Sequence, residues 1–396
     1  MRFRLEAERW VSLSRRGGSY SPTGAALLAS AVTVVCVLPT FLVGAMAVQI
    51  STELALSTST LGLAIGISRG SGAGASAPLG RLADRIGTVW SLRLAMVIAA
   101  LSSLGIFLTV VGVKSLVAWL VVAGSANALG QPAANRLLAR VVRPGRLGAA
   151  FGVKQSAPPA ALMLAGFCVP LVALTAGWRW AFFLGAAAAG LVILAVGRRP
   201  SEAARSPRVS VVERVSRRET AIYTVAFGFG TAASSAATAF YVASAVASGT
   251  SPSTAGLILA VASCAAVLAR LISGWGCDRM ATGHLRMCAY MLGVGCVGYA
   301  FLAVGNPNFA AMGIIVALAG SWGFNGVFWF ALVRAYSAVP GAITGALAPG
   351  GLLGAAVGPI AFGYLAEHAT YETAWMVAGV MSAMAAWAMV LGDRRL

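Results

Sequence analysis

The chain has 396 residues, of which 59% are hydrophobic and only 10% are charged, and its formal net charge is +18. A soluble domain holds roughly 25% charged residues, so this composition excludes a soluble enzyme, a collagen and a disordered chain. Nucleic-acid binding is excluded as well, because the Lys and Arg residues are scattered in short groups between hydrophobic runs. The chain is predicted to lie in a membrane.

Twelve hydrophobic runs follow one another along the chain, and each is close to the roughly 20 residues that a helix needs to cross a bilayer. The first begins near Gly24, and the others fall at 59–79, 92–112, 116–138, 150–174, 179–197, 220–247, 254–274, 287–304, 309–334, 343–365 and 373–391. The first run follows a basic tail, as in a signal peptide, but it is too long for one. We therefore expect an uncleaved first helix and twelve membrane spans.

The placement of basic residues predicts the orientation. Of the 29 Lys and Arg residues, 23 lie in the tails and in the loops on the side of the termini, and only Lys114 and Arg179 lie on the other side. Cytoplasmic loops of membrane proteins carry the excess of Lys and Arg. Both termini are therefore predicted to be cytoplasmic, in a bacterial inner-membrane protein that functions as a monomer.

A polar central segment divides the chain into two parts that repeat each other. Thr60-Leu61-Gly62-Leu63 matches Thr254-Ala255-Gly256-Leu257, and Asp84-Arg85 matches Asp278-Arg279, both at an offset of 194 residues. The predicted organisation is a tail (1–23), a six-helix bundle (24–197), a cytoplasmic loop (198–219) and a second six-helix bundle (220–396). The basic loop is expected to be a solvated linker attracted to anionic membrane lipids.

One motif resembles a known family. The segment Gly80-Arg81-Leu82-Ala83-Asp84-Arg85-Ile86-Gly87 resembles the loop between the second and third helices of the major facilitator superfamily, and Gly274-Trp275-Gly276-Cys277-Asp278-Arg279 is a degenerate copy. The resemblance implies an all-α protein of twelve transmembrane helices in two pseudo-symmetric bundles. It also implies a secondary transporter without a cofactor, rather than an enzyme. The second copy departs from the first in having Ala281 where the first has Gly87.

The motif predicts a conformational gate. Gly80 permits close approach of a neighbouring helix, and the carboxylate of Asp84 can cap a helix N-terminus. The resemblance implies that Asp84 caps the eleventh helix, near residues 341–345, only while the cytoplasmic side is closed. The alternative is a solvated loop. The predicted gate residues are Gly80, Asp84, Arg85, Gly87, Asp278 and Arg279.

Four basic residues fall inside the predicted spans. Arg69 lies ten residues from each end of its helix, where a charge is costly and usually functional, so we predict that it binds an anion. The alternative is packing against polar groups of another helix. Lys154, Arg270 and Arg136 lie about one turn from the basic ends of their helices, where they either contact solute or extend to the interface. Lys154 precedes the helix-distorting pair Pro158-Pro159.

None of the eleven carboxylates falls inside a predicted span. A site for a cationic solute would need a buried carboxylate, and proton antiport usually needs one to titrate. The spacing of His and Cys suggests no metal site. The sequence therefore favours a small anionic solute, with proton cotransport left open because the solute itself could carry the proton. Efflux of drugs or neutral metabolites is the alternative function.

Further candidates follow from the family architecture, in which the first, fourth, seventh and tenth helices line the pathway. For each of them, hydrogen bonding between membrane helices is the favoured alternative to solute binding. They are Thr40, Asn127, Gln131, Tyr223, Ser235, Tyr241, Trp322, Asn325 and Trp329. The segment Gly177-Trp178-Arg179-Trp180 weakly resembles the start of the sixth helix in anion and monocarboxylate porters.

Overall fold

A computed structural model describes residues 20–142, 144–197, 217–280, 282–336 and 340–393. The predicted tail and most of the central loop lie outside these residues. The described secondary structure is entirely helical. Its elements are α2 (Pro22–Ala45), α3 (Ala47–Leu54), α4 (Thr58–Thr109), α5 (Val113–Val141), α6 (Pro144–Gln155), α7 (Ala157–Cys168), η1 (Val169–Ala173), α8 (Trp178–Ala195), α9 (Arg217–Ala247), α10 (Pro252–Arg279), α11 (His284–Leu302), α12 (Pro307–Ala317), η2 (Leu318–Trp322), α13 (Phe324–Ala335), α14 (Pro340–His368) and α15 (Tyr371–Asp393).

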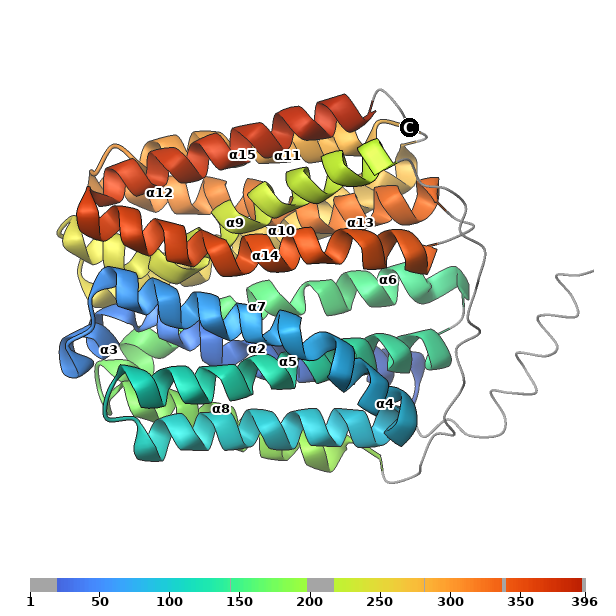
Figure 1. The fold of residues 1–396 in the computed structure, drawn as a ribbon, viewed down its shortest axis with the longest axis horizontal. Helices are drawn as coiled ribbons and strands as arrows, with labels where there is room; N and C mark the ends of the chain where they lie inside the picture. The colour runs from blue at the N-terminus through green and yellow to red at the C-terminus, as the bar shows by residue number, and fades with distance from the viewer. Residues whose placement is uncertain (1–19, 143, 198–216, 281, 337–339, 394–396) are drawn as a thin grey trace, which may run out of the picture.

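The described residues contain eleven helices long and apolar enough to cross a membrane. One of them, α4, has 52 residues and is interrupted at Gly87, whose backbone has φ 80° and ψ 172°. At 1.5 Å per residue, a straight helix of that length would be about twice as long as a bilayer core is thick. Figure 1 shows that α4 doubles back on itself. It therefore supplies the second and third spans, and the predicted all-α fold of twelve spans is confirmed.

The helices form two bundles that lie side by side (Figure 1). We call α2 to α8 the N-bundle and α9 to α15 the C-bundle. A shared hydrophobic core includes Phe41 of the N-bundle and Tyr241 of the C-bundle, and each bundle has a second core of its own. The exposed hydrophobic residues, such as Leu108 and Leu194, are those of a protein whose outer face contacts lipid.

Two of the spans are broken in ways that free backbone carbonyl groups. The fifth span is interrupted between α6 and α7, where Pro159 has no N–H to donate to the carbonyl of Gln155. The tenth span contains the π-helical turn η2, which ends at Trp322. Single π-helical turns inside α-helices are frequent at functional sites. Both breaks supply acceptors to the site described below.

Helices α4 and α14, one from each bundle, pack closely at one end of the described spans. A Cβ atom on Gly62 would lie 2.4 Å from the carbonyl oxygen of Pro359 in α14, and one on Gly66 would lie 2.4 Å from Ile360. Further along α4, a Cβ atom on Gly74 or Gly80 would meet no described atom within 4 Å. We call the end near Gly80 the basic end, and the other the opposite end. In this conformation α4 therefore packs against α14 at the opposite end and has open space around it at the basic end.

Candidate transport pathway

Arg69 lies near the middle of the first arm of α4. Its neighbour Ser68 fixes that part of the helix, since the Ser68 hydroxyl donates to the carbonyl of Leu120 in α5 at 3.0 Å and lies 3.1 Å from the hydroxyl of Thr40 in α2. The guanidinium of Arg69 lies over the ring of Phe41, 5.3 Å from its centroid. Its Nε atom is buried without a hydrogen-bond partner among the described residues. Arg69 therefore has donor capacity to offer.

Arg270 of α10 donates hydrogen bonds to backbone carbonyl groups of both bundles. Its Nε and Nη2 atoms donate to the carbonyl of Trp322 at 3.3 and 3.0 Å, and its Nη1 donates to the carbonyl of Gln155. The guanidinium also lies 5.2 Å from the centroid of the Trp322 ring. Gln155 belongs to the N-bundle and Trp322 to the C-bundle, so Arg270 joins the two bundles through the carbonyl groups at the two helix breaks.

Lys154 is the third basic residue of the pathway, and its side chain is buried at 2% exposure. Its amine donates to the side-chain carbonyl of Gln131 and, at 3.5 Å, to that of Gln155. Both partners are neutral carboxamides. A buried cation normally has an anionic partner or a coordinated ligand, and no described carboxylate is within salt-bridge distance of Lys154.

These three basic residues belong to one continuous set of contacts. The rings of Phe41 and Trp322 meet edge to face, with centroids 5.7 Å apart, and this contact joins the Arg69 region to the Arg270 region. Gln155 then joins Arg270 to Lys154. The structure thus places Arg69, Lys154 and Arg270 along one boundary between the bundles.

The predicted amide residues are divided between this set and its surroundings. Gln131 accepts from Lys154, and the Nδ2 atom of Asn325 donates to the carbonyl of Trp322 at 3.3 Å. The Oδ1 atom of Asn127, one helical turn from Gln131 on α5, is buried without a hydrogen-bond partner among the described residues. Asn127 therefore offers an unused acceptor on a helix that already contributes Gln131.

The predicted residues of α9 are packed into hydrophobic cores. Tyr223 is fully buried and its hydroxyl donates to the carbonyl of Gly392 in α15 at 3.4 Å. Tyr241 is buried at 1% exposure in the shared core, and Ser235 donates to the carbonyl of Ala355 at 2.8 Å. On α13, the ring of Trp329 packs edge to face on Phe227 of α9. These contacts are typical of residues that pack helices against one another.

The first gate motif makes its contact within the N-bundle. The carboxylate of Asp84 pairs with Arg136 of α5, and the side chains are 71% and 26% exposed. Arg136 therefore has an ionic partner near the basic end of its helix. Much of the predicted capping target near residues 341–345 lies outside the described side chains. Gly80 has open space around it in this conformation.

The second gate motif is built differently. Arg279 lies over the ring of Trp275 on its own helix, 3.3 Å from the centroid, and its Nη1 donates to the carbonyl of Trp275 at 3.4 Å. The side chain of Asp278 and the whole of Ala281 lie outside the described residues. The exposed Arg279 is thus engaged with its own helix.

At the opposite end a carboxylate joins the two bundles. Glu367, near the end of α14, accepts a hydrogen bond of 2.7 Å from the backbone N–H of Ser59, in the first turn of α4. The first N–H groups of a helix have no partner within the helix and favour negative charge. This contact lies beside the close packing of Gly62 on Pro359 and strengthens the closure of that end.

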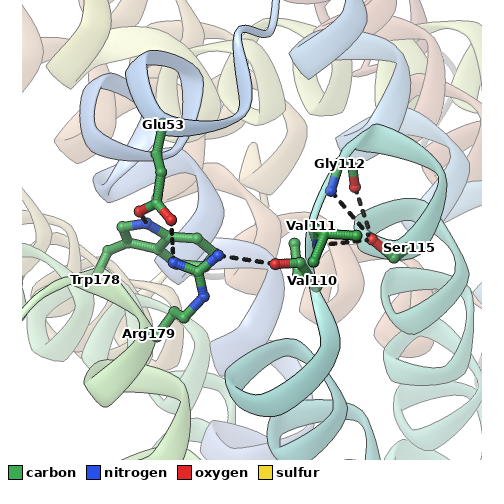
Figure 2. Close-up of polar contacts among 7 residues, drawn as sticks. All are labelled: Glu53, Val110, Val111, Gly112, Ser115, Trp178 and Arg179. Atoms are coloured by element: carbon green, nitrogen blue, oxygen red, sulfur yellow. Dashed lines mark hydrogen bonds and ion pairs between the residues drawn. The ribbon is translucent and has the colours of Figure 1, made fainter.

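A second polar network at the opposite end stays within the N-bundle (Figure 2). Glu53 accepts from Trp178 Nε1 at 2.5 Å and pairs with Arg179, whose Nη2 donates to the carbonyl of Val110 at 2.8 Å. The hydrogen bond from Arg179 is the main cause that lowers the pKa of Glu53. At the start of α5, the hydroxyl of Ser115 accepts a hydrogen bond from the backbone N–H of Gly112 at 3.3 Å. The Trp178-Arg179 pair thus fastens α8 to α3 and to the α4–α5 connection.

Two residues that connect the basic residues, Phe41 and Gln155, were missed by the sequence analysis. The double proline gave a signal for Gln155, because Pro159 must leave the carbonyl four residues earlier without its helical donor. Phe41 gave no comparable signal in a run of apolar residues.

Comparison with known proteins supports the fold. The family model for the Major Facilitator Superfamily matches residues 28–359. A D-xylose-proton symporter is 17% identical, with a TM-score of 0.74 over 93% of this chain and 97% of its own. A bacterial homologue of the human lysosomal transporter Spinster, in an inward-facing and occupied conformation, is 15% identical, with a TM-score of 0.75 over 96% and 98%. The xylose transporter XylE from E. coli, in a partially occluded inward-open conformation, is 15% identical, with a TM-score of 0.76 over 94% and 99%. No curated protein matches the sequence.

Proposed function

Because the chain belongs to the Major Facilitator Superfamily, and is thus a multi-pass membrane transporter, we propose that it moves a small anionic solute by alternating access between its two bundles. The solute binds at the boundary lined by Arg69, Lys154 and Arg270. Arg69 is its main contact. The basic end faces the cytoplasm, as the excess of Lys and Arg at that end favours, and the protein resides in a bacterial inner membrane. In this orientation the described conformation faces inward.

One observation supports the anionic solute above the others. Arg69 is a guanidinium with a buried Nε atom that has no hydrogen-bond partner among the described residues, at a depth where a charge without a partner is costly. Arg270, by contrast, has its Nε, Nη1 and Nη2 atoms bound to carbonyl groups. An anion beside Arg69 would supply both the missing acceptor and the missing counter-charge.

The carboxylates point to the same class of solute. Every described carboxylate lies at a helix end or beside the turn of α4, and none contacts Arg69, Lys154 or Arg270. A cation entering this boundary would meet three basic residues and no described acid. An anion would meet three basic residues, two of them stacked on aromatic rings.

The test is counterflow in proteoliposomes at equal pH on both sides. The panel is nitrate, phosphate, lactate and benzoate, compared with glucose and the lipophilic cation tetraphenylphosphonium. Arg69→Ala is expected to lower counterflow of the transported anion tenfold or more, since a charged hydrogen bond contributes about 1.5–3 kcal/mol. Arg217→Ala, at an exposed position in the first turn of α9, is the matched control. Counterflow of the lipophilic cation alone, unchanged in Arg69→Ala, would replace this proposal with efflux.

A further inference from the structure

We propose that Lys154 carries the proton in this transporter, so that each anion crosses together with one proton bound to the Lys154 amine. The inference rests on the proposed function above and adds the coupling ion and the residue that binds it. It starts from a chemical contrast among the cations. The chain has 27 Arg residues and only two Lys residues, Lys114 and Lys154, and one of these two is buried in the pathway.

The pathway needs a group that can gain and lose a proton, and Lys154 is the basic residue with that chemistry. Arginine keeps its proton in proteins, so Arg69 and Arg270 cannot serve. A lysine amine releases its proton much more readily when it is buried. The described carboxylates lie at helix ends or beside the turn of α4, and His284 and His368 lie at helix ends, away from the pathway.

The partners of Lys154 suit both of its protonation states. Gln131 and Gln155 present carbonyl oxygens to the amine, and a carboxamide that rotates by half a turn presents its NH₂ group instead. The charged amine can therefore donate to them, and the neutral amine can accept from them. A carboxylate partner would favour the charged form at all times and would prevent this exchange.

The groups around Lys154 favour its coupling to an anion. On α2, the titratable group that interacts electrostatically with Lys154 is the buried thiol of Cys36. On α5, Gln131 is neutral and Arg136 is paired with Asp84. On α10, the cation Arg270 binds the carbonyl of the adjacent Gln155, and the described residues of α7 include no charged group near Lys154. The charged amine thus has no anionic partner among the described residues and gains a counter-charge when an anion enters.

The charge balance of the step follows. In the empty site the amine is neutral; on loading it takes one proton from the water on the side that is open, and one monovalent anion binds beside the resulting ammonium. The net charge of the site is the same before and after loading. On the other side the anion leaves and the amine returns its proton to water. Transport of a monovalent anion is therefore electroneutral, driven by a pH difference and not by membrane voltage.

The first experiment uses the same panel of nitrate, phosphate, lactate and benzoate in proteoliposomes, under an imposed pH difference. The wild-type chain is expected to accumulate the transported anion against its gradient. In Lys154→Arg, whose charge is permanent, pH-driven accumulation is expected to fall at least tenfold and counterflow to lose its pH dependence. Lys114→Arg, at an exposed site in the first turn of α5, makes the same chemical change and is expected to behave like the wild type.

The outcomes separate the two proposals. If no anion gives Arg69-dependent counterflow, the proposed function fails. If counterflow depends on Arg69 but Lys154→Arg still accumulates the anion at the wild-type ratio, the function stands and the role of Lys154 is overturned.

A second measurement needs no solute. Lysine labelled with ¹³C at Cε gives two signals in this chain, and Lys114→Arg assigns the one that belongs to Lys154. That signal is expected to titrate over the pH range in which transport depends on pH. A Lys154 signal that stays constant over that range would also overturn the inference.

Discussion

The turns between the second and third spans of the two bundles reverse the chain in different ways. In the N-bundle, Gly87 has φ 80° and ψ 172°, a region that only glycine populates readily. In the C-bundle, Gly283 has φ 81° and ψ 19°, near the left-handed region that asparagine also adopts. The charged residues of the two motifs differ too. Asp84 pairs with Arg136 on another helix, while Arg279 stacks on Trp275 of its own helix.

The same asymmetry extends to the membrane interior. The described buried side-chain atoms without a hydrogen-bond partner all belong to the N-bundle, in Ser30, Gln49, Arg69, Thr88, Arg93, Asn127 and Asn135. The C-bundle contributes a cation whose donors are bound, Arg270, together with the aromatic wall formed by Trp322. The two bundles have thus diverged in their polar contacts. In the proposed function, the N-bundle supplies the free polar atoms for the solute and the C-bundle closes against them.

The largest effect is expected at the N-bundle turn. Gly87→Asn should lower the free energy of unfolding by about 1–3 kcal/mol, because φ 80° with ψ 172° is strained for any residue with a Cβ atom. Gly283→Asn should cost less than about 1 kcal/mol, since asparagine tolerates the left-handed conformation. Thermal unfolding of the purified full chain measures both. Equal losses at the two turns would contradict the difference between them.

The next effect concerns the gate rather than stability. Asp84→Asn is expected to lower transport about tenfold, equivalent to about 1.4 kcal/mol, with unchanged expression. An exposed ion pair contributes little to stability, so the loss should appear in the transport cycle. Arg279→Gln is expected to have an effect of about twofold at most, because Arg279 binds its own helix. Wild-type transport by Asp84→Asn would remove the gating role, and equal losses would make the two motif copies equivalent.

The fold was largely predictable because membrane spans leave strong signals in a sequence. Runs of about 20 apolar residues identify the spans, and the matched motifs identified the repeat. Where the structure adds detail, the cause is local backbone chemistry. The second and third spans merge into one helical element because the turn at Gly87 is so short, and the fifth and tenth spans break at a proline pair and at a π-helical turn.

The candidate site was less predictable, because a periodic apolar pattern does not specify which faces of two bundles meet. The cost of burying a charge identified Arg69, Lys154 and Arg270 without any knowledge of their partners. Whether a donor is already bound depends on contacts between distant segments, and this separates the bound Arg270 from Arg69, whose Nε has no described partner. Tyr223 shows the converse, since a polar residue on a lining helix can pack against another helix of its own bundle, here α15.

The contact between the bundles at the opposite end should have a moderate effect. Glu367→Gln weakens the hydrogen bond to the N–H of Ser59 by removing its charge, and should shift the equilibrium about two- to fivefold toward opening of that end. Distances between spin labels placed on the opposite ends of α5 and α11 measure this population. Glu372→Gln is the matched control, since Glu372 lies at the same end but packs against Gly305 within the C-bundle. An unchanged distance distribution in Glu367→Gln would show that glycine packing alone closes this end.

The smallest effect is expected at the clamp formed by Glu53, Trp178 and Arg179 in the N-bundle (Figure 2). Glu53→Gln should lower the Tm at neutral pH by about 1–2 °C, because the pair is partly exposed. Since the hydrogen bond from Arg179 lowers the pKa of Glu53 in the folded state, the contribution is present above the ordinary carboxyl pKa and is lost as the pH falls through the lowered value. The Tm values of wild type and variant should therefore converge in acid. A difference that stays constant with pH would mean that the clamp acts through shape and hydrogen bonding and not through the charge of Glu53.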